Sequence, residues 1–226
     1  MINKVTDIES AIDHVKPGDT IMIGGFTLSG CPLNLLKELA KRPEINHLTA
    51  ISEDIGYANP INARSVGELY DNHQISTIRA SFLGSNQRIN DLIRDGALEY
   101  ELIPQGTLAE RLRAGGAGIG GFYTPTGIGT VVEKGKEKKV INGKEYLLEL
   151  PLRADVALIK AFRADRMGNA EFLYSAKNFN PLMAMAANTV ILEVEELVEP
   201  GEIDPGRVEL PGVFVDHVVL VEGGGY

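Results

Sequence analysis

The sequence predicts an α/β protein in which a mostly parallel sheet is flanked by helices and carries an inserted β-hairpin. Short apolar runs of strand length alternate with segments of helical periodicity along the 226 residues. The run from Thr20 to Ile23 is apolar and β-compatible, as in a strand buried on both faces. The pair Asn142-Gly143 lies between two strand-like segments and suits the positive φ of a type I′ turn, which indicates a hairpin.

The elements are expected in the following order. Thr6 and Glu9 have the spacing of a capping box, and the short amphipathic helix that follows ends before Pro17-Gly18. Later helices are expected over residues 33–40, 86–94, 107–113 and 181–187. Strands are expected over residues 20–23, 48–51, 75–83, 98–103, 156–159, 190–194 and 215–221.

The hairpin interrupts this alternation. It comprises Val131-Val132, then residues 138–141 and 144–148, and we expect it to form an antiparallel flap on the main sheet. The sequence contains no internal repeat, low-complexity tract or long linker, so residues 1–226 are expected to form a single domain.

Composition limits the classes of partner and the location. The net charge of -9 offers no basic field for a nucleic acid or an anionic membrane surface. The single cysteine, Cys31, excludes an intrachain disulfide and a multi-cysteine zinc site, and the N-terminal residues do not resemble a secretory signal. No apolar run reaches the ~18 residues of a membrane span. We therefore expect a cytoplasmic protein that binds small molecules or other proteins, with no nucleic acid and no membrane.

A glycine-rich segment follows the first strand and precedes a helix. Its residues are Gly24, Gly25, Phe26, Thr27, Leu28, Ser29 and Gly30. Glycines allow a ligand to approach the backbone and a helix N-terminus favours an anion, so the segment suits a phosphate or pyrophosphate. A tight strand-to-helix turn without a ligand explains it equally well, and the lysine of a P-loop is absent.

A second cluster, residues 115–121, contains the pattern G-x-G-x-x-G at Gly116, Gly118 and Gly121. It follows a helical stretch instead of a strand, which argues against a dinucleotide site. Small and hydroxyl residues continue it to Thr130 as a long loop, and loops of that length are usually functional.

Four blocks resemble the α subunits of the family I (3-oxoacid type) CoA-transferases, and together they span nearly the whole chain. The blocks are Gly18 to Pro32 with its Ile-Met-Ile-Gly-Gly-Phe core, Pro104 to Arg111, Gly115 to Thr130, and Asn178 to Pro181. Pro17 is a departure, because the family signature usually carries Asp or Asn there. The resemblance implies the CoA-transferase fold.

The resemblance also implies a reaction and a partner. In this family a glutamate attacks an acyl-CoA thioester, giving an acyl-glutamyl anhydride and then a glutamyl-CoA thioester. That glutamate belongs to the β subunit, so this chain is expected to be an α subunit that needs a β-type partner, in a heterotetramer. The substrates are an acyl-CoA, such as succinyl-CoA, acetyl-CoA or a 3-oxoacyl-CoA, and a carboxylic acid. Coenzyme A is a substrate here, and no further cofactor is implied.

Two sets of site residues follow from the resemblance. Residues 24–30 correspond to the CoA-binding stretch of the family. Gln105 resembles the family glutamine that faces the reacting carbonyl, where an amide N–H stabilises negative charge on the thioester oxygen.

Glu53 and Asp54 follow the second strand, at a strand end where ligands collect in open α/β sheets. Related α subunits often carry an Asn pair or Asn-Asp here. The acidic pair therefore either influences substrate choice, since like charges raise a neighbouring carboxyl pKa, or belongs to a solvated loop. The run from Ser52 to Gly56 superficially resembles the setting of the β-subunit nucleophile, but it has an extra residue before Gly56. We expect Glu53 not to be the nucleophile.

The remaining candidates have weaker signals. Cys31 has no motif that places His or Asp beside it, so it is expected to be a packing residue. The four histidines are scattered, and no metal site is expected. The lysines near the hairpin either lie on a solvated surface or reach a CoA phosphate; they are Lys134, Lys136, Lys138 and Lys139. A non-catalytic ligand-binding or regulatory module of the same fold is the alternative to an enzyme.

Overall fold

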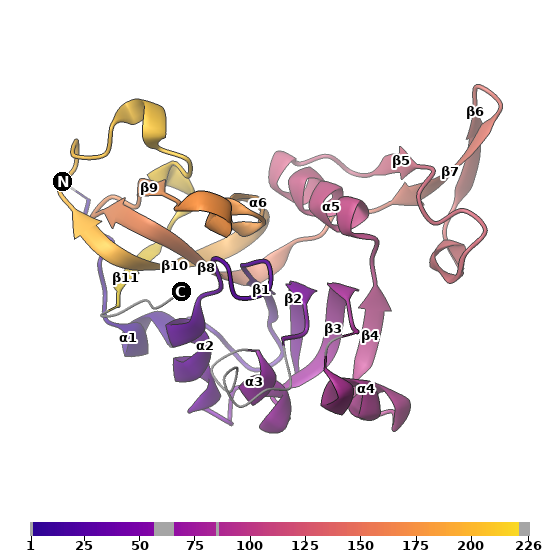
Figure 1. Cartoon of the computed structure of the whole chain (residues 1–226), viewed down its shortest axis with the longest axis horizontal. Coiled ribbons are helices and arrows are strands. Elements are labelled where there is room, and N and C mark those ends of the chain that lie inside the picture. Colours follow the sequence, from indigo (N-terminus) through magenta and orange to yellow (C-terminus); the bar gives the residue numbers. More distant parts are fainter. Residues whose placement is uncertain (1, 57–65, 85, 222–226) are drawn as a thin grey trace.

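In the computed structural model, the described residues are 2–56, 66–84 and 86–221 (Figure 1). The α-helices are α1 (Ile8–Ile12), α2 (Leu33–Ala40), α3 (Gly67–Asp71), α4 (Gln87–Arg94), α5 (Gln105–Ala117) and α6 (Asn180–Ala186). The strands are β1 (Thr20–Ile23), β2 (Leu48–Asp54), β3 (Ile75–Phe82), β4 (Glu99–Leu102), β5 (Phe122–Thr124), β6 (Lys138–Ile141), β7 (Lys144–Glu149), β8 (Ala154–Asp165), β9 (Ala170–Glu171), β10 (Ala187–Val198) and β11 (His217–Leu220). Short 3₁₀ helices cover Val131–Glu133, Tyr174–Lys177, Pro205–Arg207 and Gly212–Phe214.

The main sheet confirms the predicted fold class. Its strands run in the order β11-β10-β8-β1-β2-β3-β4 and pair in parallel, while the short β9 adds to β8 in antiparallel. Helices α1 to α4 lie on one face and α5 and α6 on the other (Figure 1). Parallel strands of this kind are expected to be covered on both faces.

Strand β1 has the burial that its apolar sequence predicts. Ile21 and Ile23 belong to the core on the side of α2, and Met22 belongs to the core that contains Leu108 of α5. These three β1 side chains are no more than 1% exposed. Because successive side chains of a strand point to opposite faces, one strand joins both cores, and each such side chain stabilises the fold by roughly 1.5–3 kcal/mol.

The direction in which successive strands are added to the sheet reverses between β1 and β8. From β1 the chain builds β2, β3 and β4 toward one edge, and then returns to build β8, β10 and β11 toward the other. The helix after β1 covers one face, and the helix after β8 covers the opposite face (Figure 1). Crevices outside the carboxyl ends of strands at such a switch point are where open α/β sheets bind ligands. The glycine-rich segment begins there.

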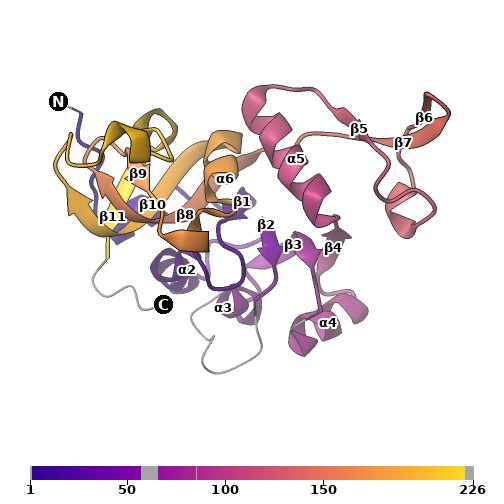
Figure 2. The ribbon, with the colours of Figure 1, turned by 45° about the horizontal axis from the view of Figure 1, so that its top comes forward.

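The predicted hairpin exists, but its expected place on the main sheet is wrong. Strands β6 and β7 are joined through Asn142 and Gly143, both at positive φ, as the turn prediction requires. They belong to a separate antiparallel sheet of order β5-β7-β6, which projects away from the main sheet (Figures 1 and 2). Strand β5 pairs with β7 and satisfies its second edge. Val131 and Val132 lie in a 3₁₀ helix and not in a strand.

A chain of ion pairs holds this small sheet to the body. Arg111 of α5, only 9% exposed, donates to the Leu150 carbonyl at 2.8 Å and to Glu101 of β4 at 2.7 Å. Its guanidinium is 3.9 Å from Glu149 of β7, which also binds Lys136 at 2.5 Å. A buried carboxylate such as Glu149 requires cations of this kind, so the charges fix the base of the projecting sheet.

Helix α5 is longer at both ends than the sequence predicts. It begins at Gln105, and it continues through Gly115 and Gly116, which were expected to lie in a loop. It ends at Ala117 and is capped by Gly118, whose left-handed conformation (φ 69°) is usual at a helix C-terminus. The G-x-G-x-x-G pattern therefore spans a helix C-terminus, which agrees with the rejection of a dinucleotide site.

Other boundaries also differ from the sequence prediction. The N-cap of α1 is Asp7, whose carboxylate accepts from the Ser10 amide at 2.7 Å, and not Thr6. The helix ends at Ile12, before the predicted stop. Strands β8 and β10 are longer than expected because they pair with each other along most of their length. Helix α3 and strands β5 and β9 were not predicted.

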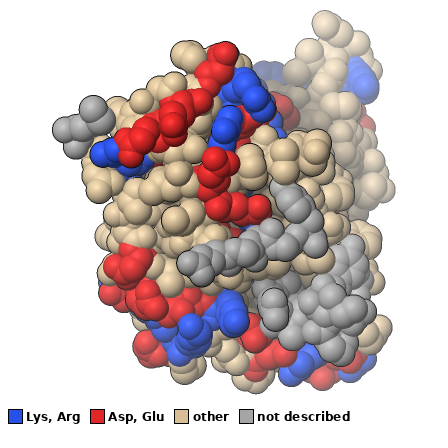
Figure 3. Space-filling model, turned by 60° about the vertical axis from the view of Figure 1, so that its left-hand side comes forward, with Lys and Arg blue, Asp and Glu red and all other residues tan. Residues whose placement is uncertain are grey.

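In the part of the chain that is described, no helix has the length and apolar character needed to cross a membrane. On the face shown in Figure 3, Asp and Glu side chains gather in groups with Lys and Arg side chains beside them. That face presents no continuous basic patch of the kind that binds nucleic acid phosphates. The division of residues 1–226 into a single domain stays a prediction.

Substitution of Gly115 tests the packing of α5. A Cβ atom there would lie 1.9 Å from the Leu152 carbonyl oxygen, whereas one at Gly120 meets nothing within 4 Å. We expect Gly115→Ala to lower the free energy of unfolding by about 3 kcal/mol, because the backbone must shift. Gly120→Ala, the matched control, should change it by less than about 0.5 kcal/mol. Urea denaturation measures both, and equal effects would contradict this account of the glycine.

Candidate functional site

The glycine-rich segment forms a tight loop beyond the end of β1. The Gly24 amide continues the pairing with β8 by donating to the Leu158 carbonyl at 2.9 Å. Phe26 and Ser29 then exchange backbone hydrogen bonds of 3.0 and 3.1 Å, with Thr27 in the left-handed region (φ 54°). The turn leaves the side chains of Phe26 and Leu28 at the loop tip 41% and 44% exposed.

Two asparagines fix this loop: Asn178, which precedes α6, and Asn180, the first residue of α6. The amide nitrogen of Asn180 donates to the Gly30 carbonyl at 3.1 Å, and its oxygen accepts from the Lys160 amide of β8 at 3.1 Å. The amide of Asn178 donates to the Ser29 carbonyl at 2.9 Å. The loop is therefore joined to α6 and β8 by side chains about 150 residues away in sequence.

The same packing explains all three glycines of the loop. A Cβ at Gly24 would lie 1.9 Å from the Asn180 side-chain oxygen, and one at Gly30 would lie 2.3 Å from a carbonyl oxygen of the neighbouring 3₁₀ helix. Gly25 has a φ of 114° and would bring a Cβ to 3.0 Å from the Cys31 backbone. Contacts inside the chain are thus sufficient to require glycine here, independently of any ligand.

The N-terminus of α2 does not offer the anion site that the sequence suggested. The carboxylate of Glu193, fully buried in β10, accepts from the backbone amides of Asn34 at 2.9 Å and Leu35 at 3.1 Å. The Leu33 amide donates to the Cys31 carbonyl at 2.9 Å. An internal carboxylate therefore occupies the place in which a phosphate was expected.

Glu193 is part of a small charge cluster behind the loop. The ammonium of Lys160 is 2.9 Å from Glu195 and 3.8 Å from Glu193. Burial raises the pKa of Glu193, and the amides of Asn34 and Leu35 together with Lys160 oppose this rise. Lys160 is thus engaged by two carboxylates of its own chain.

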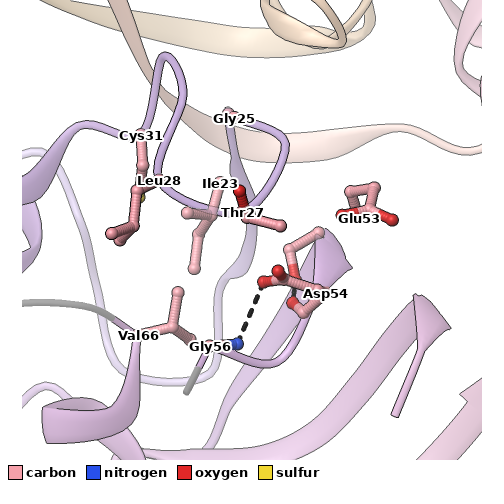
Figure 4. Close-up of a pocket in the computed structure, with 11 residues that line it drawn as sticks. Ile23, Gly25, Thr27, Leu28, Cys31, Glu53, Asp54, Gly56 and Val66 are labelled. Carbon is pink, nitrogen blue, oxygen red and sulfur yellow. Dashed lines mark hydrogen bonds between the residues drawn. The ribbon is translucent and has the colours of Figure 1, made fainter. Parts of the chain in front are cut away.

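A small cavity joins the loop to the carboxyl end of β2. Its lining residues are Ile23, Gly24, Gly25, Thr27, Leu28, Cys31, Ser52, Glu53, Asp54, Gly56 and Val66. Its free space of about 10 Å³ holds about one water molecule. In Figure 4, Thr27 lies on the side of the loop that faces Glu53 and Asp54, and Asp54 points toward Gly56. The structure therefore brings the predicted CoA-binding loop and the predicted acidic pair together.

Glu53 and Asp54 are not in a solvated loop. They end strand β2 and are 5% and 7% exposed. One oxygen of Asp54 accepts from the Gly56 amide at 3.0 Å, and one oxygen of Glu53 is 3.3 Å from the Ser81 hydroxyl. Within the described residues, the second oxygen of each carboxyl has no hydrogen-bond partner. Buried carboxyl oxygens without a hydrogen-bond partner are rare in folded proteins.

Burial governs the acidity of this pair. Burial and the neighbouring charge of Asp54 raise the pKa of Glu53, and the Ser81 hydroxyl and Thr27 amide oppose the rise. Burial raises the pKa of Asp54, and the Gly56 amide opposes it. The expectation that like charges would raise a carboxyl pKa here is met, although burial is the larger cause.

Gln105 is not among the residues that line this cavity. It is the first residue of α5 and follows β4, three strands away from β1 in the sheet, and it is exposed. Because β4 and β1 are parallel, Gln105 lies toward the same carboxyl edge of the sheet as the glycine-rich loop. Its catalytic role stays a prediction.

The other candidates have structural roles. Cys31 is buried, and burial raises the pKa of its thiol, so it packs as predicted. His14 and His217 stack with ring centroids 4.1 Å apart. The described residues include no group of three or more His, Cys, Asp or Glu residues that could hold a metal ion. Of the four lysines, Lys138 pairs with Glu133 at 2.8 Å and Lys139 lies over the Tyr123 ring.

Sequence reasoning did not identify the residues that support the loop. Asn178 and Asn180 were noticed only as part of a family block, with no role, and Lys160 and Glu193 were not noticed. Their pairing across β8, β10 and the loop is tertiary, so local pattern offers no signal for it. Among these residues, Glu193 gives the one local signal, because a glutamate inside an apolar strand is unusual.

Removal of the Asn180 amide tests the support of the loop. Asn180→Ala would leave the Gly30 and Ala176 carbonyls and the Lys160 amide without this partner. We expect the free energy of unfolding to fall by about 3 kcal/mol, because buried polar groups lose their hydrogen bonds. In the control Asn46→Ala, an exposed amide is lost, and the change should stay below about 0.5 kcal/mol. A neutral Asn180→Ala in chemical denaturation would refute this support.

Both the sequence and the fold of this chain match known proteins. Residues 5–220 match the family model described as "Coenzyme A transferase". Over 96% of this chain and 92% of the relative, the sequence is 45% identical to the A-type subunit of succinyl-CoA:3-ketoacid coenzyme A transferase from Helicobacter pylori strain J99. It is 47% identical to the acetoacetyl-CoA:acetate/butyrate CoA transferase alpha subunit of Clostridium acetobutylicum, over 97% of this chain and 98% of the relative.

A solved structure of an acyl-CoA transferase from Escherichia coli O157:H7, a thioester complex with CoA, has the same fold with a TM-score of 0.87 and 23% identity. The match covers 97% of this chain and 47% of that one, so this chain spans about half of its length. The family model covers nearly the whole sequence and the curated relatives are CoA-transferase α subunits, and on this ground the chain belongs to the coenzyme A transferase family.

Proposed function

We propose that this chain is the α-type subunit of a CoA-transferase that, with a β-type subunit, moves CoA between a short acyl-CoA and a carboxylic acid. The observation that carries the proposal is the cavity at the sheet's switch point, where the glycine-rich loop meets the end of β2. The loop is held rigidly by Asn178 and Asn180, which suits a surface that must orient a thioester.

The proposed chemistry divides between the two subunits. The carboxylate of the partner's glutamate attacks the thioester carbonyl; the C–S bond breaks, CoA leaves as its thiolate, and an acyl-glutamyl anhydride forms. The thiolate then attacks the glutamyl carbonyl, which releases the first acid and leaves a glutamyl-CoA thioester. A second carboxylate reverses these steps. This chain contributes the loop that binds CoA and the exposed amide of Gln105, whose N–H stabilises the developing oxyanion.

A non-catalytic binding module of the same fold is the weaker alternative. The curated relatives at 45% and 47% identity carry enzyme names, which favours the enzyme. We further propose a cytoplasmic location, a heterotetramer with the β-type subunit, and coenzyme A as a substrate without another cofactor. Neither nucleic acid nor a membrane is proposed as a partner.

Co-expression with a β-type subunit tests the proposal. We expect a stable complex that exchanges CoA between acyl-CoA and acetate, and no exchange by the isolated chain. Borohydride reduction of the complex after incubation with acyl-CoA should trap the thioester on the partner's glutamate, located by mass spectrometry. A label on Glu53, or full activity of the isolated chain, would refute the division of labour.

Loss of the Gln105 amide tests its predicted role. In the assembled complex, Gln105→Ala should lower kcat by about 10²–10³-fold with little change in KM, because a transition-state donor is removed. Gln87→Ala is the control, since Gln87 is also exposed at the first position of a helix. Steady-state kinetics of CoA transfer distinguish the two, and an unchanged kcat for Gln105→Ala would remove it from the mechanism.

A further inference from the structure

Residues 119–150, here called the arm, comprise β5, β6, β7 and the loop between β5 and β6, and they project from the body (Figures 1 and 2). All residues of the arm are described. Among the described elements, its three strands have extensive contacts only with one another, and neither core of the body includes an arm side chain. Leu147 is the one apolar side chain of the arm that is buried. The arm therefore has almost no core of its own.

One face of the arm sheet is covered by the arm's own loop. A Cβ atom at Gly127 would lie 2.8 Å from a methyl carbon of Val132 and 3.4 Å from one of Leu147. Val132 belongs to the 3₁₀ helix in that loop, so the loop packs on the side of β7 to which Leu147 points. Lys138, on the same face through its pairing with Leu147, binds Glu133 of the loop at 2.8 Å.

The opposite face of the arm sheet is open. Side chains alternate along a strand, so those of β7 on either side of Leu147 point away from the covering loop, as do their cross-strand neighbours. The side chains of this open face, none of which is buried, are Tyr123, Lys139, Ile141, Lys144, Tyr146 and Leu148.

Two lysines lie over the tyrosine rings of the open face. The ammonium of Lys139 is 5.2 Å from the ring centroid of Tyr123, and that of Lys144 is 5.9 Å from the ring centroid of Tyr146. The arm contains five lysines, no arginine and four glutamates, whereas the whole chain has 22 basic and 31 acidic residues. The arm is therefore the basic part of an acidic chain, and it favours a partner surface that carries carboxylates.

The apolar part of the open face extends to the base of the arm. Leu150, directly after β7, is 57% exposed. A Cβ atom at Gly121 would lie 3.2 Å from the Leu148 side chain and 3.6 Å from that of Leu150, so the two leucines lie side by side and the glycine leaves them uncovered. A small sheet needs an apolar face packed against another surface, and tyrosines and leucines bordered by charge are typical of protein–protein interfaces.

The arm is within reach of a subunit bound at the candidate site. It begins just after the C-terminus of α5, and Gln105 is at the N-terminus of that helix. The 13-residue helix is about 20 Å long. A β-type subunit of about this chain's length would have a radius of gyration of about 17 Å and a width of about 40 Å. A subunit that brings its glutamate to Gln105 therefore extends to the arm.

We propose, resting on the CoA-transferase function above, that the open face of the arm is a binding surface for the β-type subunit. The complementary surface of that subunit is apolar and carries carboxylates opposite Lys139 and Lys144. This contact adds to the one at the candidate site and covers the apolar side chains that the isolated chain leaves open.

Two pairs of exposed substitutions test this surface through the dissociation constant of the α/β complex, measured by isothermal titration calorimetry. Leu150→Asn should raise Kd about tenfold, whereas Val140→Asn, at a 64% exposed position on the covered face, should change it less than about twofold. Lys144→Glu should also raise Kd about tenfold, and less as salt is added. Its control is Lys134→Glu, which reverses an exposed charge next to the 3₁₀ helix of the covering loop.

Circular dichroism establishes that each variant is folded. Sedimentation of the isolated chain distinguishes the other occupant of the face, a second copy of this chain: we expect the same mass for wild type and Leu150→Asn, and a dimer that this substitution dissociates would overturn the proposal. If the complex transfers CoA but Leu150→Asn and Lys144→Glu bind the β-type subunit no more weakly than their controls, this inference is wrong and the proposed function stands. If the wild-type chain neither binds a β-type subunit nor supports CoA transfer, the proposed function fails and this inference fails with it.

Discussion

The side chain of Asn180 is the contact on which the candidate site depends. Its amide group joins the glycine-rich loop after β1 to β8 and to the 3₁₀ helix before α6, so three segments distant in sequence share one buried hydrogen-bonding group. A buried amide with its donors and its oxygen satisfied imposes a defined geometry, because each missing partner would cost free energy. The requirement for glycine at Gly24, and part of that at Gly30, follows from this contact.

The buried carboxylate of Glu193 performs a similar function at the next element. A helix N-terminus presents unsatisfied amides and a partial positive charge, which commonly attract a ligand anion. Here β10 supplies the anion from inside the protein, so α2 is fixed against the sheet before any substrate binds. The loop region contains two pairs of acidic residues: Glu53 and Asp54 line the cavity below the loop, and Glu193 and Glu195 flank Lys160 behind it.

The projecting sheet is positioned by charge as well as by backbone pairing. Exposed ion pairs contribute little to stability, but Arg111 and Glu149 are largely buried and hydrogen-bonded, and they connect α5 and β4 with β7. The rigid base that results allows the β5-β7-β6 sheet to extend away from the body (Figure 2).

The sequence by itself determined the elements whose pattern is local. The apolar run of β1, the helical periodicity of α2 and α4, and the Asn142-Gly143 turn depend on residues within a few positions of one another, and all are present. The family blocks pointed to the glycine-rich loop and to Gln105, because motif residues are contiguous in sequence.

Tertiary structure decided what the local pattern does not encode. Helix α5 continues through Gly115 and Gly116 because those glycines allow Leu152 and Met185 to pack against it closely. The hairpin belongs to a separate sheet instead of the main sheet, because β7 pairs with β5. Glu53 and Asp54 are buried beside the glycine-rich loop, and Glu193 binds the N-terminal amides of α2, where a phosphate was expected. Each of these features depends on contacts between residues that are distant in sequence. Burial and charge can change the properties of a side chain only once those contacts have formed, so a local sequence pattern does not predict them.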